Sequence, residues 1–102
     1  MILVTTDTVP GKEITACLGM ILACVPFFGT KYGEGITNLN GVTTPDVSAV
    51  YEKRRSEAFE RLAWGAEGMG ANAVIAVRMD VREITSTWKE ICAYGTAVVI
   101  ET

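Results

Sequence analysis

The sequence predicts an α+β fold of two layers, in which one main helix packs on a small, mainly antiparallel sheet in the order β-β-α-β-β. Three observations predict it. An uncharged apolar run occupies residues 14–28, a helical periodicity spans residues 44–69, and two alternating segments follow at 72–82 and 91–101. With 102 residues, the chain is expected to form one domain, 1–102, with a hydrophobic core of its own.

The N-terminal half is expected to supply two strands. Residues 2–6 (ILVTT) are typical of a short strand, and Pro10-Gly11 predicts a turn after it. The run 14–28 is rich in β-branched and large apolar residues, which favours a second and longer strand. Residues 29–46 are rich in Gly, Asn and Thr, and are expected to form a long loop.

The apolar run is not expected to cross a membrane. A spanning helix needs about 20 apolar residues, and this run is shorter and is interrupted by Gly19 and Pro26. A signal peptide carries positive charge before its apolar region, whereas only Lys12 precedes this one and acidic residues offset it. The sequence therefore predicts a cytoplasmic protein without a membrane partner.

The helix has recognisable ends. Thr44-Pro45-Asp46 offers an N-cap with proline in the first turn, and Gly70 is a natural C-terminal stop. Its apolar residues recur every three or four positions and are Tyr51, Ala58, Phe59, Leu62, Ala63 and Ala66. The last two strands, 72–82 and 91–101, are expected to pair as a hairpin through the polar connector 83–90.

Both faces of the predicted sheet carry apolar residues. One helix covers one face of a small sheet, yet Tyr94, Val98 and Ile100 make the other face of the final strand apolar as well. Leaving this surface in water would expose a larger patch than monomers usually tolerate. We therefore expect a homo-oligomer, in which other copies of the chain cover the second face. The alternative is that the 29–46 loop folds back over it.

Charge and composition exclude several partners. The net charge is −3 and the pI is about 4.9, and no basic run occurs, so neither nucleic acid nor an anionic membrane is an expected partner. The chain has no histidine, which removes the usual general base and the commonest metal ligand together. Its three cysteines cannot all pair within the chain, which favours free thiols in a reducing compartment.

The cysteines Cys17, Cys24 and Cys92 are the candidate metal ligands, because soft metals bind thiolates. On a straight strand Cys17 and Cys24 would lie on opposite faces and roughly 23 Å apart, too far to share an ion. Gly19 between them predicts a bulge, which can shift the alternation of side chains. The sequence therefore does not assign either cysteine to a face of the sheet. Cys92 could approach one of them if the two strands pair.

Two further functions remain open. A homo-oligomeric scaffold could bind a small ligand between subunits, with contacts from the loop at residues 29–41 and from aromatic residues; the cofactor or ligand itself stays unknown. Those aromatic residues are Tyr32, Trp64, Trp88 and Tyr94. An enzyme would have to use a cysteine without histidine, or carboxylates near the hairpin such as Asp80, Glu83 and Glu90. Binding or scaffolding therefore ranks above catalysis, and we assign no catalytic residue.

Several motifs resemble the YbjQ-like family, small bacterial and archaeal proteins often labelled heavy-metal-binding. The matching motifs are Gly19, the helix residues Arg55, Ala58, Phe59 and Leu62, the run Gly70-Ala71-Asn72-Ala73-Val74, and Gly95-Thr96-Ala97-Val98. The resemblance covers nearly the whole chain. It implies a two-layer subunit shaped like that of dodecin, assembled as a ring that is typically a homopentamer. It supplies no catalytic residues.

The chain also departs from the family pattern. A small-acidic pair often found after the Gly19 region is replaced here by Ala23-Cys24. Any ligand role of that acidic position elsewhere in the family therefore does not transfer to this chain. The glycines have structural interpretations: Gly70 suits a left-handed helix end, and Gly95 suits close packing against its strand.

Overall fold

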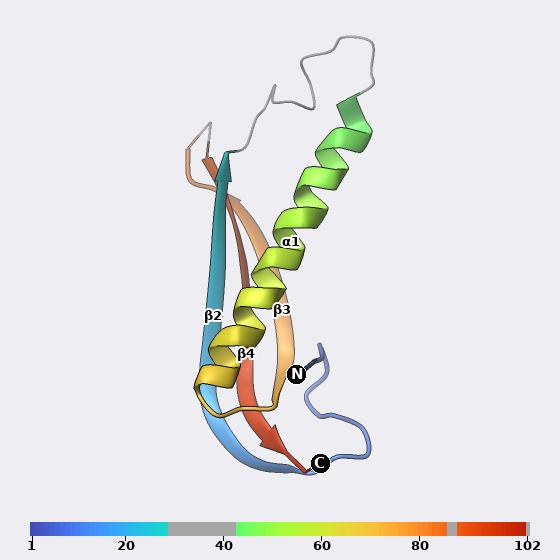
Figure 1. Ribbon diagram of the computed structural model, residues 1–102, viewed down its shortest axis with the longest axis vertical. Helices are drawn as coiled ribbons and strands as arrows, with labels where there is room; N and C mark the ends of the chain where they lie inside the picture. Colours follow the sequence, from blue (N-terminus) through green and yellow to red (C-terminus); the bar gives the residue numbers. More distant parts are fainter. Residues whose placement is uncertain (29–42, 86–87, 102) are drawn as a thin grey trace.

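One long helix lies against one face of a four-stranded sheet in the computed structural model, which describes residues 1–28, 43–85 and 88–101 (Figure 1). The elements are β1 (Ile2–Leu3), β2 (Ile14–Phe28), α1 (Thr43–Gly68), β3 (Ala73–Glu83) and β4 (Trp88–Ile100). The sheet order is β1-β3-β4-β2. β4 pairs antiparallel with both neighbours, and β1 pairs parallel with β3. The predicted α+β class and element order are confirmed.

Three element boundaries differ from the sequence prediction by more than one residue. β1 is shorter than 2–6, although the Val4 amide still donates to the carbonyl of Val74. β4 starts at Trp88 rather than 91, because the polar residues before Ile91 pair across the hairpin with β3. α1 already includes 43–46, while 29–42 of the predicted loop lies outside the described residues.

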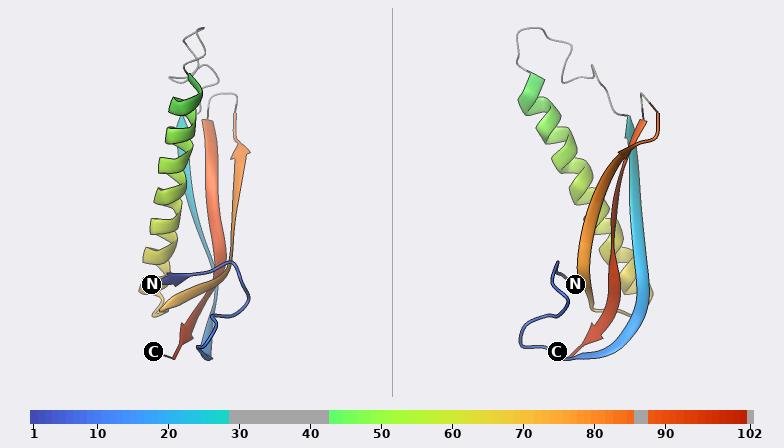
Figure 2. Two further views of the ribbon diagram at one scale, coloured as in Figure 1. Left: turned by 90° about the vertical axis from the view of Figure 1, so that its right-hand side faces the viewer. Right: turned by 180° about the vertical axis from the view of Figure 1, so that it is seen from behind.

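Small residues bring the helix close to the sheet. Ala58, Leu62 and Ala66 lie on one stripe of α1 and are fully buried. They pack on the inner face of the sheet, whose buried residues are Val25, Phe27, Val74, Val77, Ile91, Ala93 and Ala97. Figure 2 shows that the N-terminal half of α1 diverges from the strands, so the core gathers around its C-terminal half. α1, the helix within the described residues, is not apolar enough over its length to span a membrane.

The predicted glycine roles are confirmed. Gly19 has φ +116° beside a register shift between Cys17 and Gly19, as expected for a bulge. Gly70 has φ +93° and ends the helix in the left-handed region. A Cβ on Gly95 would lie 2.8 Å from the carbonyl oxygen of Ile75, so β3 packs directly on this glycine.

The second face of the sheet is covered at one end by the chain itself. Val98 and Ile100 are buried in one cluster with Val9 of the segment that joins β1 and β2. Figure 2 shows this segment on the side of the sheet away from α1. The sequence led us to expect that other copies of the chain, or the 29–46 loop, cover this face. At the end of β4 the segment between β1 and β2 covers it instead, because the turn after β1 folds that segment across the strand. Farther along the same face Met20 is 80% exposed and Leu22 is 61% exposed.

Candidate metal centre

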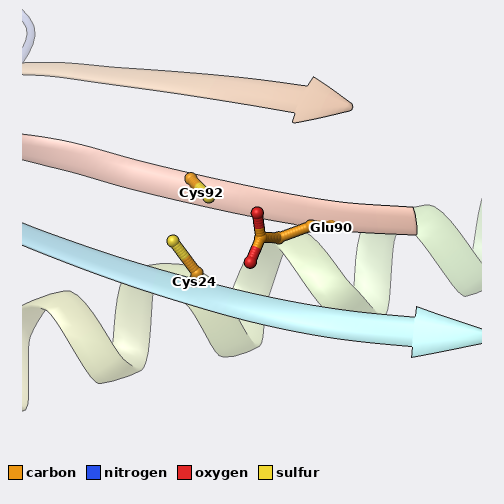
Figure 3. A group of neighbouring side chains, drawn as sticks. All are labelled: Cys24, Glu90 and Cys92. Carbon is orange, nitrogen blue, oxygen red and sulfur yellow. The ribbon is translucent and has the colours of Figure 1, made fainter. Parts of the chain in front are cut away.

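Cys24 and Cys92 lie directly opposite each other on the paired strands β2 and β4. Glu90 precedes Cys92 by two residues and therefore shares its face of the sheet. The two thiol sulfurs and a carboxylate oxygen of Glu90 all lie within 4.8 Å of one another. Figure 3 shows the three side chains converging on the side of the strands away from α1. All three are half-buried.

Backbone hydrogen bonds show which kind of pair the two cysteines form. At the β3–β4 hairpin, the Ile84 amide donates to the carbonyl of Trp88, so the backbone groups of Trp88 point toward β3. In an antiparallel ladder every second residue points its backbone groups to the same neighbouring strand, so Cys92 does the same. In this ladder Cys92 directs its backbone groups toward Asp80 on β3, and not toward β2. The Cys24 carbonyl accepts instead from the Arg61 guanidinium of α1, at 3.4 Å. Cys24 and Cys92 are therefore a non-hydrogen-bonded pair, the closer of the two cross-strand types.

The surroundings of Cys92 keep its thiol protonated at neutral pH. Burial, together with hydrogen bonding to Cys24 and Glu90, raises the pKa of Cys92 to about 12. The Glu90 carboxylate in turn accepts a hydrogen bond from Arg82 at 2.9 Å, across the β3–β4 ladder. In the metal-free state the cluster therefore holds a protonated thiol beside a carboxylate that an arginine neutralises.

The donor set fits a soft metal ion. Cysteine thiolates are the ligands that such ions prefer, and a carboxylate completes many sites that also contain sulfur. A cation entering here would displace a proton from Cys92 and would face the Glu90 carboxylate, which Arg82 also contacts. The three side chains supply fewer than the four ligands of a closed zinc site, so one coordination position would stay open.

The structure brings together two of the three predicted cysteines. Cys17 is exposed on β2, opposite Val98 and on the far side of the bulge at Gly19, and it takes no part in the cluster. Sequence reasoning missed Glu90 as a ligand and considered it only as a catalytic carboxylate. Its signal was the spacing Glu90-x-Cys92, which places both side chains on one face of any strand.

The other carboxylates near the hairpin are paired. Glu83 accepts from Lys89 at 2.9 Å, and Asp80 accepts from the Tyr94 hydroxyl at 3.2 Å. The hydrogen bond to Asp80 also raises the pKa of Tyr94. Among residues 1–28, 49–85 and 88–101, no charged residue is buried.

The aromatic candidates do not form a common pocket in the described part of the chain. Trp64 is 77% exposed and lines an open groove along α1. Trp88 lies at the start of β4, and Tyr94 lies on the face that carries the cysteines. Tyr32 and the loop 29–41 lie outside the described residues.

Sequence comparisons match the chain over its whole length. Residues 1–101 match a YbjQ family profile described as "Putative heavy-metal-binding". A UPF0145 protein of Streptomyces coelicolor is 36% identical, over 98% of this chain and 97% of its own. A UPF0145 protein of Thermoplasma volcanium is 40% identical, over 99% of this chain and 85% of its own.

A solved structure shares the fold. It is the crystal structure of a protein of unknown function from Pediococcus pentosaceus, assigned to the DUF74 family. It superposes with a TM-score of 0.68 and 17% sequence identity, covering 99% of this chain and 98% of the other. At this sequence identity the similarity shows a shared two-layer fold and does not extend to function.

Proposed function

Starting from the fact that the chain belongs to the YbjQ family of UPF0145 proteins, we propose that it binds a soft metal ion through Cys24, Cys92 and Glu90. The observation that carries this proposal is the convergence of two sulfurs and one carboxylate oxygen within 4.8 Å. The family description names heavy metals without naming ligands. The proposal assigns the ligands to residues of this chain.

The cross-strand position supports metal binding in two ways. The cysteines come from different strands, so the sheet holds both donors in place before the ion arrives, which lowers the cost of ordering them. Their sulfurs also lie at the surface of one face rather than in the core beneath α1. A cation can therefore reach them without opening the core.

Cadmium is a suitable probe, because it is soft and its thiolate bonds absorb in the ultraviolet. The experiment titrates reduced protein with Cd²⁺ and records both the absorbance and the heat of binding. We expect one ion per chain for the wild type and for Cys17→Ser, and a loss of affinity of at least tenfold for Cys24→Ser and Cys92→Ser. Equal cadmium affinity in all four proteins would overturn the proposal.

A second candidate function is a homo-oligomeric binding scaffold, and exposed apolar side chains favour it. Met20 and Leu22 are largely exposed on the second face, and Trp64 and Val81 are exposed elsewhere. The Cα radius of gyration is 16.5 Å, against about 13 Å for a compact domain of this length. An elongated chain with exposed apolar side chains gains stability when copies pack together.

The family resemblance makes a homopentameric ring the expected assembly, with any small ligand bound between subunits. The cysteines lie on the same face as Leu22, so assembly would place the metal centre next to a subunit interface. A reducing compartment such as the cytoplasm would keep the thiols available. Native mass spectrometry at micromolar concentration tests the assembly: five copies are expected, and a single chain at every concentration would contradict it.

A further inference from the structure

The cysteine pair has a second chemistry that does not depend on metal. We infer that Cys24 and Cys92 form a reversible disulfide within one chain, across the β2–β4 ladder. The inference goes beyond metal binding, because it needs only the two thiols and the register that places them opposite each other.

The register supplies the geometry. A disulfide joins residues whose Cα atoms lie between about 4.4 and 6.8 Å apart. Non-hydrogen-bonded cross-strand pairs have Cα atoms about 4.5 Å apart, and two independent backbone contacts put Cys24 and Cys92 in this class. One is the ladder that begins where Ile84 donates to Trp88, and the other is the donation from Arg61 to the Cys24 carbonyl. The thiols also converge on the same side of the sheet (Figure 3).

The third cysteine is excluded by position. Cys17 lies seven residues before Cys24 on the same strand, which separates them by roughly 23 Å along an extended chain. Its partner across the ladder is Val98 and not a cysteine. Only one intrachain disulfide is therefore compatible with the folded strands.

A hydroperoxide supplies the oxidant. The sulfur of one thiol attacks a peroxide oxygen, the O–O bond breaks, and that sulfur becomes a sulfenic acid while water or an alcohol leaves. The second sulfur then attacks the sulfenic sulfur, the S–O bond breaks and water leaves. In sum, two thiols and one hydrogen peroxide give one disulfide and two waters, and a dithiol reductant reverses the change. Because both sulfurs are consumed, the oxidised chain would have no thiolate left in the metal centre.

The test uses the Cys17→Ser protein, because Cys17 and Cys24 fall in one tryptic peptide, 13–31. Metal-free, reduced protein is treated with hydrogen peroxide, and its free thiols, intact mass and tryptic peptides are measured. We expect both thiols to disappear, the mass to fall by two hydrogen atoms, and peptide 13–31 to be linked to peptide 90–102. Dithiothreitol should restore both thiols.

Two controls make the result decisive. Wild type should retain one reactive thiol, that of Cys17, and Cys24→Ser should form no intrachain disulfide although it keeps two cysteines. Unchanged thiols, a gain of oxygen atoms on either cysteine, or a disulfide only between chains would overturn the inference. Because this experiment contains no cadmium, its result does not depend on whether the chain binds metal. A second sample, loaded with cadmium before the peroxide is added, tests the metal proposal separately. Where cadmium binds, it should slow disulfide formation at least tenfold.

Discussion

Arg82 and Glu90 form a 2.9 Å ion pair at the border of the cysteine cluster, so the carboxylate that faces the two sulfurs is already engaged by an arginine. The hydrogen bond that Arg82 donates to Glu90 is the main reason that the pKa of Arg82 is raised. Arg82 thus competes with any cation for the same Glu90 carboxylate.

Replacing Arg82 with Gln should tighten cadmium binding. Exposed ion pairs are weak, so releasing Glu90 should lower the cadmium Kd only modestly, by as much as about fivefold. Isothermal titration of wild type and Arg82→Gln measures the change, with Lys89→Gln as the control, because Lys89 pairs with Glu83 outside the cluster. Weaker binding by Arg82→Gln would show that the arginine supports the metal centre instead.

Cadmium binding should strengthen with rising pH. The pKa of Cys92 is raised to about 12, so its thiol is protonated throughout the range from pH 6 to 9, and the metal must displace that proton. Each displaced proton makes the apparent affinity rise about tenfold per pH unit. Titrations in buffers of low metal affinity measure the slope, and an affinity that does not change between pH 6 and 9 would contradict Cys92 as a ligand.

Gly95→Ala should destabilise the protein, whereas Gly68→Ala should not. A Cβ at Gly95 would lie 2.8 Å from the Ile75 carbonyl oxygen and from Val74 Cγ1, and forced overpacking of this kind costs about 1–3 kcal/mol. A Cβ at Gly68 meets nothing within 4 Å, and alanine is the better helix former. Urea unfolding of the two variants gives both free energies. Equal stability would show that β3 can move away from Gly95.

Leu22→Lys should weaken assembly. Leu22 is 61% exposed on the face that we expect other copies to cover, and burying a lysine charge there would cost at least about 1.4 kcal/mol, a tenfold loss of association. Sedimentation at several concentrations compares this variant with Glu52→Lys, which changes an exposed residue of α1. An unchanged oligomer in Leu22→Lys would place the interface on another surface.

The sequence predicted local structure well and long-range pairing poorly. The capping residues Thr44 and Pro45 placed the helix start within one residue of Thr43, and Gly70 marked its end, because these signals act over a few neighbours. The cysteine pair depended on the β2–β4 register. That register passes through the bulge at Gly19, and its phase is set by contacts with β4 that no local pattern reports.

The covering of Val98 by Val9 escaped prediction for the same physical reason. The alternation in the last strand correctly indicated a second apolar face, but the partner came from a segment about 90 residues away in sequence. Glu90 illustrates the converse case. Its charge suggested a solvated connector, whereas its pairing with Arg82 extends β4 and turns its carboxylate toward the sulfurs.

X-ray absorption at the cadmium edge is the sharpest test of a metal centre formed by Cys24 and Cys92, because it counts the sulfur atoms bound to the ion. We expect two sulfur ligands for cadmium-loaded wild type and for Cys17→Ser, with oxygen completing the shell, and one sulfur or none for Cys24→Ser and Cys92→Ser. A shell of oxygen and nitrogen alone in the wild type, or two sulfurs that persist after either cysteine is removed, would contradict it.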